Sequence, residues 1–150
     1  MGTRYHGTEE EVRALDTYIK LIRATDSVSS RIHRHLDESH LTITQFGVLE
    51  ALYHLGSMYQ RDLAAKLLKS GGNITLVIDN LEKRSLVKRE REPDDRRCIR
   101  VNLTEAGKQL ISSIFPTHVA AVVAEMATLS ASEQEELGRL CRRLGKQEQL

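Results

Sequence analysis

Residues 60–103 read QRDLAAKLLKSGGNITLVIDNLEKRSLVKREREPDDRRCIRVNL, and this stretch decides the fold. Residues 60–69 have the composition of a short helix, and residues 74–81 carry apolar side chains at i, i+3, i+4 and i+7, the pattern of an amphipathic helix. The turn SGGN at 70–73 separates the two helices, and Ser70 is expected to cap the second. Residues 86–92 and 98–103 flank a five-residue turn and predict a hairpin, because apolar and polar residues alternate along 99–103.

The tip of this hairpin, PDDRR at residues 93–97, is charged and conformationally restricted. Pro93 presets the turn, and the side chain of Asp94 or Asp95 can accept hydrogen bonds from nearby backbone N–H groups. Arg96 and Arg97 are therefore expected to project from a stiff tip. A protruding arginine fits the narrow, negative minor groove of DNA. The alternative is an ordinary charged hairpin that its tip keeps soluble, and the helix pair beside the hairpin favours DNA.

The charge of the chain is concentrated in the same stretch. The whole protein has a net charge of +1, from 22 basic and 21 acidic residues. Residues 60–103 contain 11 basic and 7 acidic residues, a net +4, while residues 1–59 carry −2 and residues 104–150 carry −1. Local rather than net charge determines a phosphate-binding surface, so the central segment is the candidate site for DNA.

The second helix of the pair has an outward face of small, mostly uncharged side chains. Asn73, Thr75, Leu76 and Asn80 point away from the apolar stripe of that helix. Asn can bind adenine through two hydrogen bonds, and a helix N-terminus favours anions. A solvated helix face would show the same pattern, and the basic hairpin beside it is what favours DNA.

The flanking segments predict further helices. Residues 9–36 lack Pro and Gly and have helical apolar spacing, and roughly 28 residues would extend about 42 Å, so this helix is expected to finish burying its stripe on a partner. Thr42 and Gln45 form a capping box for a core helix that presents Phe46, Leu49, Leu52 and Tyr53 on one face. Gly56 is placed to end this helix in a left-handed conformation.

Two helices are expected after the hairpin. Thr104 is placed to cap the first, and Pro116 is expected to bend or break it. Ser130 and Glu133 form a capping box for the last helix, on which Cys141 is expected to be buried with three leucines. The fold class expected is therefore mainly α (α+β): a lobe at 41–103 with a helix pair and a hairpin wing, between long N- and C-terminal helical segments at 1–40 and 104–150.

Several other classes of protein are disfavoured. The chain has no apolar run of the roughly 18 residues that a membrane span requires and no signal-peptide pattern, so a cytoplasmic location without membrane contact is expected. No phosphate-binding, dinucleotide-binding or nucleophile motif occurs, so we expect no enzyme, catalytic residue or cofactor. His33 and His35 are two apart on a helix and would point to different faces, so no metal site is expected.

Three segments together carry a family resemblance. LTITQFGVLEAL, DLAAKLLKSGGNITLVIDNLEKRSLV and REPDDRRCIRVNLTEAG occur in this order and resemble the MarR (multiple antibiotic resistance regulator) family of winged helix-turn-helix transcriptional regulators. The resemblance covers about residues 10–145, and the PDDRR…V-x-L-T-x-x-G part is its most specific element. It implies a winged helix-turn-helix DNA-binding lobe at 41–103 and long N- and C-terminal dimerisation helices at 1–40 and 104–150. It also implies a homodimer that binds double-stranded DNA at a palindromic operator, most simply as a repressor released by a small phenolic or aromatic effector.

The resemblance also implies roles for individual residues. Asp95 and Arg97 match the D-x-R motif of the wing, in which the arginine enters the minor groove and the aspartate orients it. The expected DNA-binding set is Ser70, Gly72, Asn73, Thr75, Leu76, Asn80, Lys83, Lys88, Arg89, Arg91, Asp95, Arg96 and Arg97. The expected effector-binding set is His33, Arg34, Phe46 and Tyr53.

The chain departs from the family pattern at three places. Tyr59 stands where Ser or Thr commonly caps the third helix, SGGN replaces a more polar turn, and Ser85 stands where glycine commonly closes the recognition helix. Operator sequence therefore cannot be transferred from relatives. Two alternatives remain: a winged helix that contacts only proteins, and a regulator that senses oxidants through Cys98 or Cys141.

Overall fold

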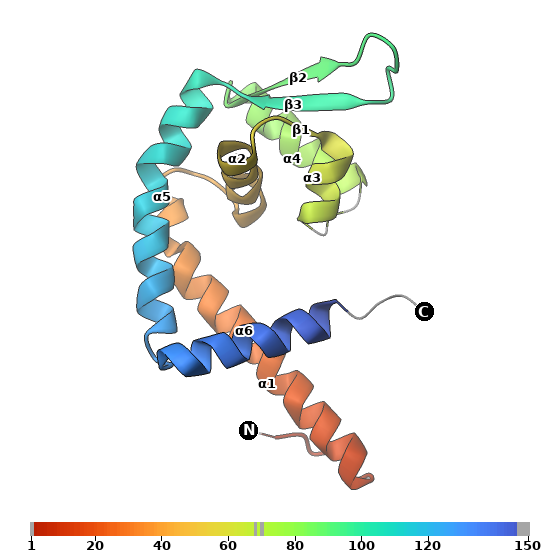
Figure 1. Cartoon of the computed structure of the whole chain (residues 1–150), viewed down its shortest axis with the longest axis vertical. Coiled ribbons are helices and arrows are strands. Elements are labelled where there is room, and N and C mark those ends of the chain that lie inside the picture. The colour runs from red at the N-terminus through yellow and green to blue at the C-terminus, as the bar shows by residue number, and fades with distance from the viewer. Residues whose placement is uncertain (1, 68, 70, 147–150) are drawn as a thin grey trace. The chain divides into compact units, whose positions relative to one another are not determined.

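The computed structural model describes residues 2–67, 69 and 71–146, and it is mainly helical with one small sheet (Figure 1). The elements in order are α1 (Glu9–Ile32), a 3-10 helix η1 (His33–Asp37), α2 (Ile43–Leu55), β1 (Met58–Tyr59), α3 (Gln60–Lys66), α4 (Gly71–Lys83), β2 (Val87–Arg91), β3 (Ile99–Leu103), α5 (Glu105–Met126) and α6 (Ala131–Gly145). The expected winged helix-turn-helix is thereby confirmed: α3 and α4 form the helix pair, and β2 and β3 form the wing.

The chain divides into two compact units. One contains α1, α6 and the end of α5, and the other runs from His33 to His118. The second unit extends beyond residues 41–103 at both ends, because η1 and the first half of α5 contribute Leu36 and Ile111 to its core.

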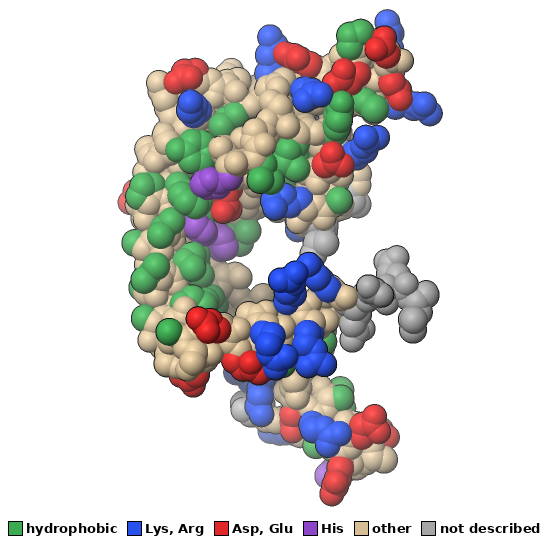
Figure 2. Space-filling view, in the orientation of Figure 1, with side chains coloured by type: hydrophobic (Ala, Val, Ile, Leu, Met, Phe, Trp, Pro, Cys, Tyr) green, Lys and Arg blue, Asp and Glu red, His purple; other side chains and the backbone are tan. Residues whose placement is uncertain are grey.

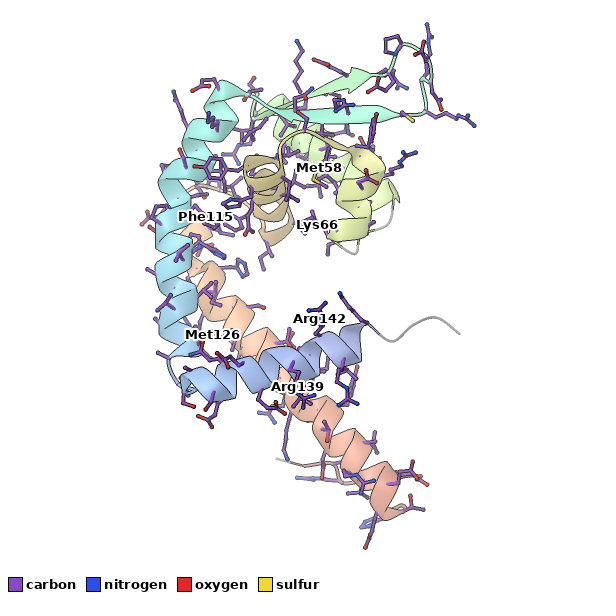
Figure 3. The ribbon with its side chains drawn as sticks, viewed as in Figure 1. Met58, Lys66, Phe115, Met126, Arg139 and Arg142 are labelled. Atoms are coloured by element: carbon purple, nitrogen blue, oxygen red, sulfur yellow. The ribbon has the colours of Figure 1, made fainter. Side chains whose placement is uncertain are left out.

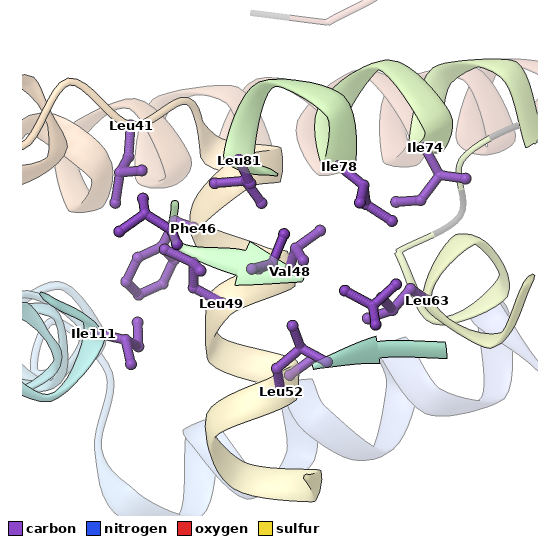
Figure 4. Close-up of a cluster of buried hydrophobic side chains, with 14 of the residues drawn as sticks. Leu41, Phe46, Val48, Leu49, Leu52, Leu63, Ile74, Ile78, Leu81 and Ile111 are labelled. Atoms are coloured by element: carbon purple, nitrogen blue, oxygen red, sulfur yellow. The ribbon is translucent and has the colours of Figure 1, made fainter. Parts of the chain in front are cut away.

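The core of the second unit is a continuous apolar cluster (Figure 4). Phe46 and Leu49 of α2 meet Ile78 of α4, Leu63 of α3 and Val101 of β3, and each of these side chains is at most 2% exposed. The inward faces expected for α2 and α4 are therefore the observed ones, except that Tyr53 is 36% exposed. This core holds the helix pair and the wing in one lobe.

The sheet is antiparallel with strand order β1-β3-β2. Val101 of β3 is paired with Arg89 of β2 on one side and Met58 of β1 on the other. The two-residue strand β1 was not expected from sequence, because two residues are too few to show a period-two pattern. It attaches the start of α3 to the base of the wing.

Local capping chemistry sets most helix ends as expected. Thr42 with Gln45 and Ser130 with Glu133 form complete capping boxes. Gly56 ends α2 with φ 81°, a positive-φ conformation that suits glycine. The hydroxyl of Thr104 accepts a hydrogen bond from the backbone N–H of Gly107 at 3.0 Å, which caps α5.

Other helix boundaries differ from expectation. The first helix ends at Ile32 rather than continuing to residue 36, and the 3-10 turn that follows brings Leu36 into the core. Gly71 and Gly72 do not form a turn between the two helices; they are the first two residues of α4. In this first turn the backbone N–H groups of any helix lack intrahelical acceptors. Ser70, the expected cap, lies outside the described residues.

Two further expectations concern the C-terminal helices. α5 runs unbroken through Pro116, so the expected break does not occur; Phe115, the preceding residue, packs against the core and supports the helix. Cys141 is exposed in the single chain, which contradicts its expected burial. Indeed no described residue of α6 is buried.

In the other unit, an ion pair between Arg31 and Glu125, at 2.7 Å, joins α1 to α5.

Among the described residues, no single helix has the length and apolar character needed to cross a membrane. Helices α5 and α6 meet that criterion only when they are taken together, and they are bent by 101° at their junction.

Candidate nucleic-acid interface

The outward face of α4 is presented as the helical periodicity predicts. Ile74, Ile78 and Leu81 are buried against the core, which turns Gly72, Asn73, Thr75, Leu76 and Lys83 outward as exposed residues and leaves Asn80 half-buried. Leu76 is 61% exposed, an unusual position for a leucine in a helix that otherwise sorts its apolar residues inward. This face is accessible to a large ligand.

The hydroxyl of Thr75, one of the expected contacts, already has two hydrogen-bond partners. Its Oγ1 donates to the carbonyl of Gly71 at 2.8 Å and accepts from Nε2 of Gln60 at 2.9 Å. The side chain therefore ties α4 to α3, and only its methyl group is left to face outward.

The tip of the wing holds Arg97 in a defined but solvent-exposed position. Oδ1 of Asp95 accepts from the backbone N–H of Arg97 at 3.0 Å and from its Nε at 3.2 Å, while the Arg97 side chain remains 92% exposed. These hydrogen bonds lower the pKa of the Asp95 carboxyl below its ordinary value, so it stays ionised. An aspartate that accepts from both backbone and side chain fixes the direction in which an arginine leaves the turn.

The rest of the wing is also ordered by local bonds. Nη1 of Arg91 donates to the carbonyl of Arg96 at 2.8 Å, and the backbone N–H of Glu92 donates to the carbonyl of Cys98 at 3.0 Å. Arg91, Arg96 and Lys88 are exposed, and Figure 2 shows Lys and Arg side chains interspersed with acidic ones around the hairpin.

Arg89 is placed differently from the other basic residues of β2. Its side chain is only 19% exposed and makes ion pairs with Asp79 and Glu82 of α4. Because the Arg89 donors are already paired inside the lobe, we do not assign Arg89 the DNA contact expected from the sequence. Sequence alone grouped it with Lys88 and Arg91 because all three are basic and adjacent.

Tyr59 and Arg61 also border this surface, although sequence reasoning did not select them. Tyr59 begins α3 without a side-chain cap, as its chemistry predicts, and its ring lies under Arg61 at 5.2 Å and Arg100 at 4.8 Å. Glu92 binds Arg100 at 3.1 Å and raises the pKa of that guanidinium further above its already basic value. No motif marks these residues, because only the fold brings α3 to the wing.

A pocket of about 270 Å³ lies between α3, the start of α4 and the start of β3 next to the wing tip. Arg61 and Arg97 line it together with Thr75 and Cys98, so the surface between helix and wing is hollowed and basic. The Cys98 thiol is half-buried there, with its Sγ 3.7 Å from Oδ2 of Asp95 and 4.0 Å from Nη1 of Arg61.

The residues expected to bind an effector lie in or beside a row of aromatic rings. Phe46 is 2% exposed and lies 4.6 Å from the ring of His118 and 6.4 Å from that of His33. Tyr53 joins the row only through His54 and Phe115, and Figure 3 shows Phe115 on α5 directed toward α2. Arg34 is exposed on η1, outside these ring contacts.

Sequence reasoning missed His35 and His118 in this row. Nε2 of His35 and Nδ1 of His118 are 3.3 Å apart, and burial together with neighbouring histidines lowers the pKa of both rings, so both are neutral at pH 7. Within the described ranges, no three His, Cys, Asp or Glu side chains are arranged to hold a metal ion.

Comparison with known proteins agrees with this architecture. The model of the MarR family matches residues 41–99. The HTH-type transcriptional regulator MhqR of Bacillus subtilis (strain 168) is 35% identical over 133 residues, which is 89% of this chain and 92% of that protein.

Solved structures show the same relationship. AbsC, a MarR family transcriptional regulator from Streptomyces coelicolor, matches 96% of this chain and 97% of its own with a TM-score of 0.80 and 26% identity. BpsR of Bordetella bronchiseptica matches 86% of this chain and 98% of its own, with a TM-score of 0.79 and 26% identity. With an exposed recognition helix and a basic wing in one lobe, this chain belongs to the MarR family and is a DNA-binding transcriptional regulator.

Proposed function

We propose that this regulator is a ligand-responsive repressor that acts in the cytoplasm without catalysis and binds a palindromic operator as a homodimer. In this proposal α4 enters the major groove and the wing enters the adjacent minor groove. The observation that carries it is Arg97, which is 92% exposed yet oriented by Asp95 in the same lobe as α4. A winged helix that contacted only proteins would have no use for a bare, oriented arginine at its tip.

The structure supports a division of labour among the expected contacts. We assign base contacts to Asn73, Leu76 and Asn80 of α4, where the exposed leucine and the methyl group of Thr75 suit the methyl group of thymine. Backbone contacts are assigned to Gly72, Lys83, Lys88, Arg91 and Arg96, with Ser70 outside the described residues. Arg97 is assigned to the minor groove.

The dependence of DNA affinity on salt tests this proposal. An operator would be selected by the purified protein from a pool of random duplexes, and its Kd measured from about 50 to 200 mM salt. If each protomer neutralises about four phosphates, log K against log salt has a slope near −7, because each phosphate contributes about −0.9. Failure to enrich any sequence, together with a slope within about one unit of zero, would reject DNA binding through this surface.

The minor-groove role of Arg97 has a matched control. Arg97→Ala should weaken operator binding by about 1 to 3 kcal/mol while thermal unfolding stays unchanged, since the side chain is 92% exposed. Arg23→Ala removes the same charge from the exposed face of α1 in the other unit and should leave affinity unchanged. If both substitutions weaken operator binding equally, the effect of Arg97→Ala comes from the loss of net charge and not from a contact in the minor groove.

The homodimer is supported by apolar side chains that one chain leaves uncovered. Tyr18 and Ile22 of α1 are 62% and 40% exposed, Val123 of α5 is 62%, and Leu140 and Leu144 of α6 are 45% and 54%. An apolar groove of about 500 Å³ beside Leu140 continues this surface. Because monomers rarely expose such contiguous patches, we assign the patch to a second copy of this chain.

Sedimentation measures the oligomeric state directly. Leu140→Glu places a charge in the proposed interface and should convert the dimer to a monomer at micromolar concentration. Glu135→Lys alters an exposed residue on the opposite face of α6 and should leave the dimer intact. A wild-type protein that sediments as a monomer at all concentrations would contradict the assignment.

Ligand response is proposed from the aromatic row and one relative. The DNA binding of BpsR is regulated by 6-hydroxynicotinic acid, a small aromatic acid. In this chain the half-buried rings of Phe115 and His118 pack together over the buried ring of Phe46, and these two rings are suited to stack on a small aromatic or phenolic effector. Release of the operator by phenols, quinones or hydroxylated pyridine acids would support this assignment, whereas release by thiol oxidants alone would favour sensing through Cys98 or Cys141.

A further inference from the structure

We propose that Arg89 is a positioning residue that determines operator specificity without touching DNA, by fixing the rotation of α4 about its own axis. This inference rests on the proposed function, because it requires α4 to read base pairs. It replaces the simpler expectation, drawn from charge alone, that Arg89 is one of several phosphate contacts on β2.

The Arg89 side chain bridges the wing to both helices of the pair. Its Nη2 donates to the carbonyl of Thr75 at 2.9 Å, and its Nε donates to Oε1 of Gln60 in α3 at 3.2 Å. Its Nη1 pairs with Oδ1 of Asp79, and with Oε1 of Glu82 at 3.5 Å. The backbone N–H of Arg89 donates to Oε2 of Glu82 at 3.0 Å, which adds a second tie to α4.

These bonds hold α4 between Thr75 and Glu82, a stretch that contains two of the proposed base contacts, Leu76 and Asn80. Thr75 and Asp79 are four residues apart, so the guanidinium spans one helical turn along a single face. Gln60 of α3 also connects Arg89 to α4, because its Oε1 accepts a hydrogen bond from Arg89 and its Nε2 donates one to the hydroxyl of Thr75 at 2.9 Å. We call this set of Arg89, Gln60, Thr75, Asp79 and Glu82 the Arg89 clamp.

The geometry explains why such a clamp affects sequence reading. A shift of one residue around a helix corresponds to about 100°, and productive contacts tolerate only about 10 to 20° of misorientation. Asn73, Leu76 and Asn80 lie on the same helix that the clamp grips. Loosening the clamp would therefore spread the directions of these side chains while leaving the basic wing in place.

The charges of the clamp argue against a phosphate contact. One guanidinium is paired with two carboxylates, so the cluster carries a net charge of −1 and repels a phosphate. The Arg89 side chain is 19% exposed, whereas neighbouring Lys88 is exposed on the other face of β2. If the Arg89 side chain turned toward DNA, Asp79 and Glu82 would lose the cation that they pair with.

The test compares specific with nonspecific binding. An operator is selected from random duplexes with the wild-type protein, and Kd is measured for it and for a scrambled duplex of equal length over a range of salt. Arg89→Lys keeps the charge but loses the planar fork of donors, and Asp79→Asn removes one carboxylate from the clamp. Lys88→Ala is the matched control, as an adjacent basic residue of the same strand.

The clamp predicts a distinct result for each variant. Arg89→Lys and Asp79→Asn should each lower the ratio of operator to scrambled affinity by about tenfold, comparable to one mismatched base pair, with the salt slope unchanged. Asp79→Asn should at the same time bind the scrambled duplex at least as tightly as wild type, since it removes a negative charge. Lys88→Ala should weaken both duplexes equally and reduce the slope by about one per protomer.

Opposite outcomes overturn the inference. If Arg89→Lys retains the wild-type affinity ratio, or if Asp79→Asn raises both affinities equally, Arg89 does not position α4. If the wild-type protein enriches no sequence at all, the proposed function itself fails and the inference fails with it. Thermal unfolding of each variant separates these cases from loss of fold, because a purely structural role would lower stability and both affinities together.

The double variant provides a second readout. If Arg89 and Asp79 act as one unit, the specificity lost in the double variant should be clearly smaller than the combined losses of the single variants. Independent, additive losses would also contradict the clamp.

Discussion

Gly107 lies where α5 meets the chain between α4 and the wing, and replacing it by alanine provides a sharp test of the packing. A Cβ atom at this position would lie 2.1 Å from the carbonyl oxygen of Leu86 and 2.8 Å from Cδ1 of Leu103. The same carbonyl accepts the backbone N–H of Thr104 at 3.1 Å, which anchors the start of α5. The obstructing atom belongs to backbone, so it cannot rotate away as a side chain would.

The magnitude follows from two opposed effects. Alanine is favoured over glycine in a helix by up to about 1 kcal/mol, which would stabilise α5. Overpacking a dense interior costs about 1 to 3 kcal/mol, and the upper end applies because α5 must retreat by roughly 1.3 Å to restore ordinary contact. We expect a net loss of about 2 kcal/mol, equivalent to a fall of about 4 to 8 °C in Tm.

Thermal and urea unfolding at one protein concentration measure this effect. Gly138→Ala in α6 is the matched control, because among the described residues no heavy atom outside the local backbone of α6 lies within 4 Å of the position that the added methyl group would take. That substitution should stabilise the protein by about 0.5 to 1 kcal/mol. A Gly107→Ala protein as stable as wild type, or more stable, would refute the close approach of α5 to Leu86.

Three further predictions concern stability. Ser85 has φ 59°, so Ser85→Gly should relieve strain and raise unfolding free energy by about 0.5 to 1 kcal/mol in urea titrations; a loss would contradict the strained conformation. Ile78→Ala empties a fully buried site and should cost about 2 to 5 kcal/mol, whereas Leu76→Ala at a 61% exposed site should change stability by less than about 0.5 kcal/mol. His35 and His118 have lowered pKa values in the folded state, so the unfolded chain binds protons first as the pH falls below the ordinary histidine pKa of 6.5. The Tm should therefore be highest above pH 6.5 and should fall on acidification toward pH 5. This fall should be smaller in the His118→Gln variant.

Much of the fold could be predicted from sequence because its signals are local. The capping boxes at Thr42 and Ser130, the inward stripe of α4 and the hairpin around Pro93 each depend on residues within a few positions of one another. The family resemblance marked Ser85 as a position where glycine commonly closes the helix, and this residue has a positive φ of 59°. Boundaries that depend on packing were not, as the end of α1 and the unbroken course of α5 through Pro116 show.

The candidate site divides in the same way. The exposed face of α4 follows from helical periodicity, and the Asp95–Arg97 pair is the one that the family resemblance implies. The roles of Arg89 and Thr75 do not follow from either, because their partners lie up to 29 residues away in sequence.

By itself, the amino-acid sequence determined that this protein has a helix pair and wing in a basic segment, where its capped helices begin, and that Arg96 and Arg97 lie at the tip of the wing, because short-range periodicity and hydrogen bonding set these features. Only the tertiary structure decided that Arg89 binds α4 through Thr75, Asp79 and Glu82, that the carbonyl of Leu86 lies against Gly107, and that His35 meets His118. Charge and residue type are properties of the chain, but whether a donor faces solvent or an internal acceptor depends on which distant segments pack against it.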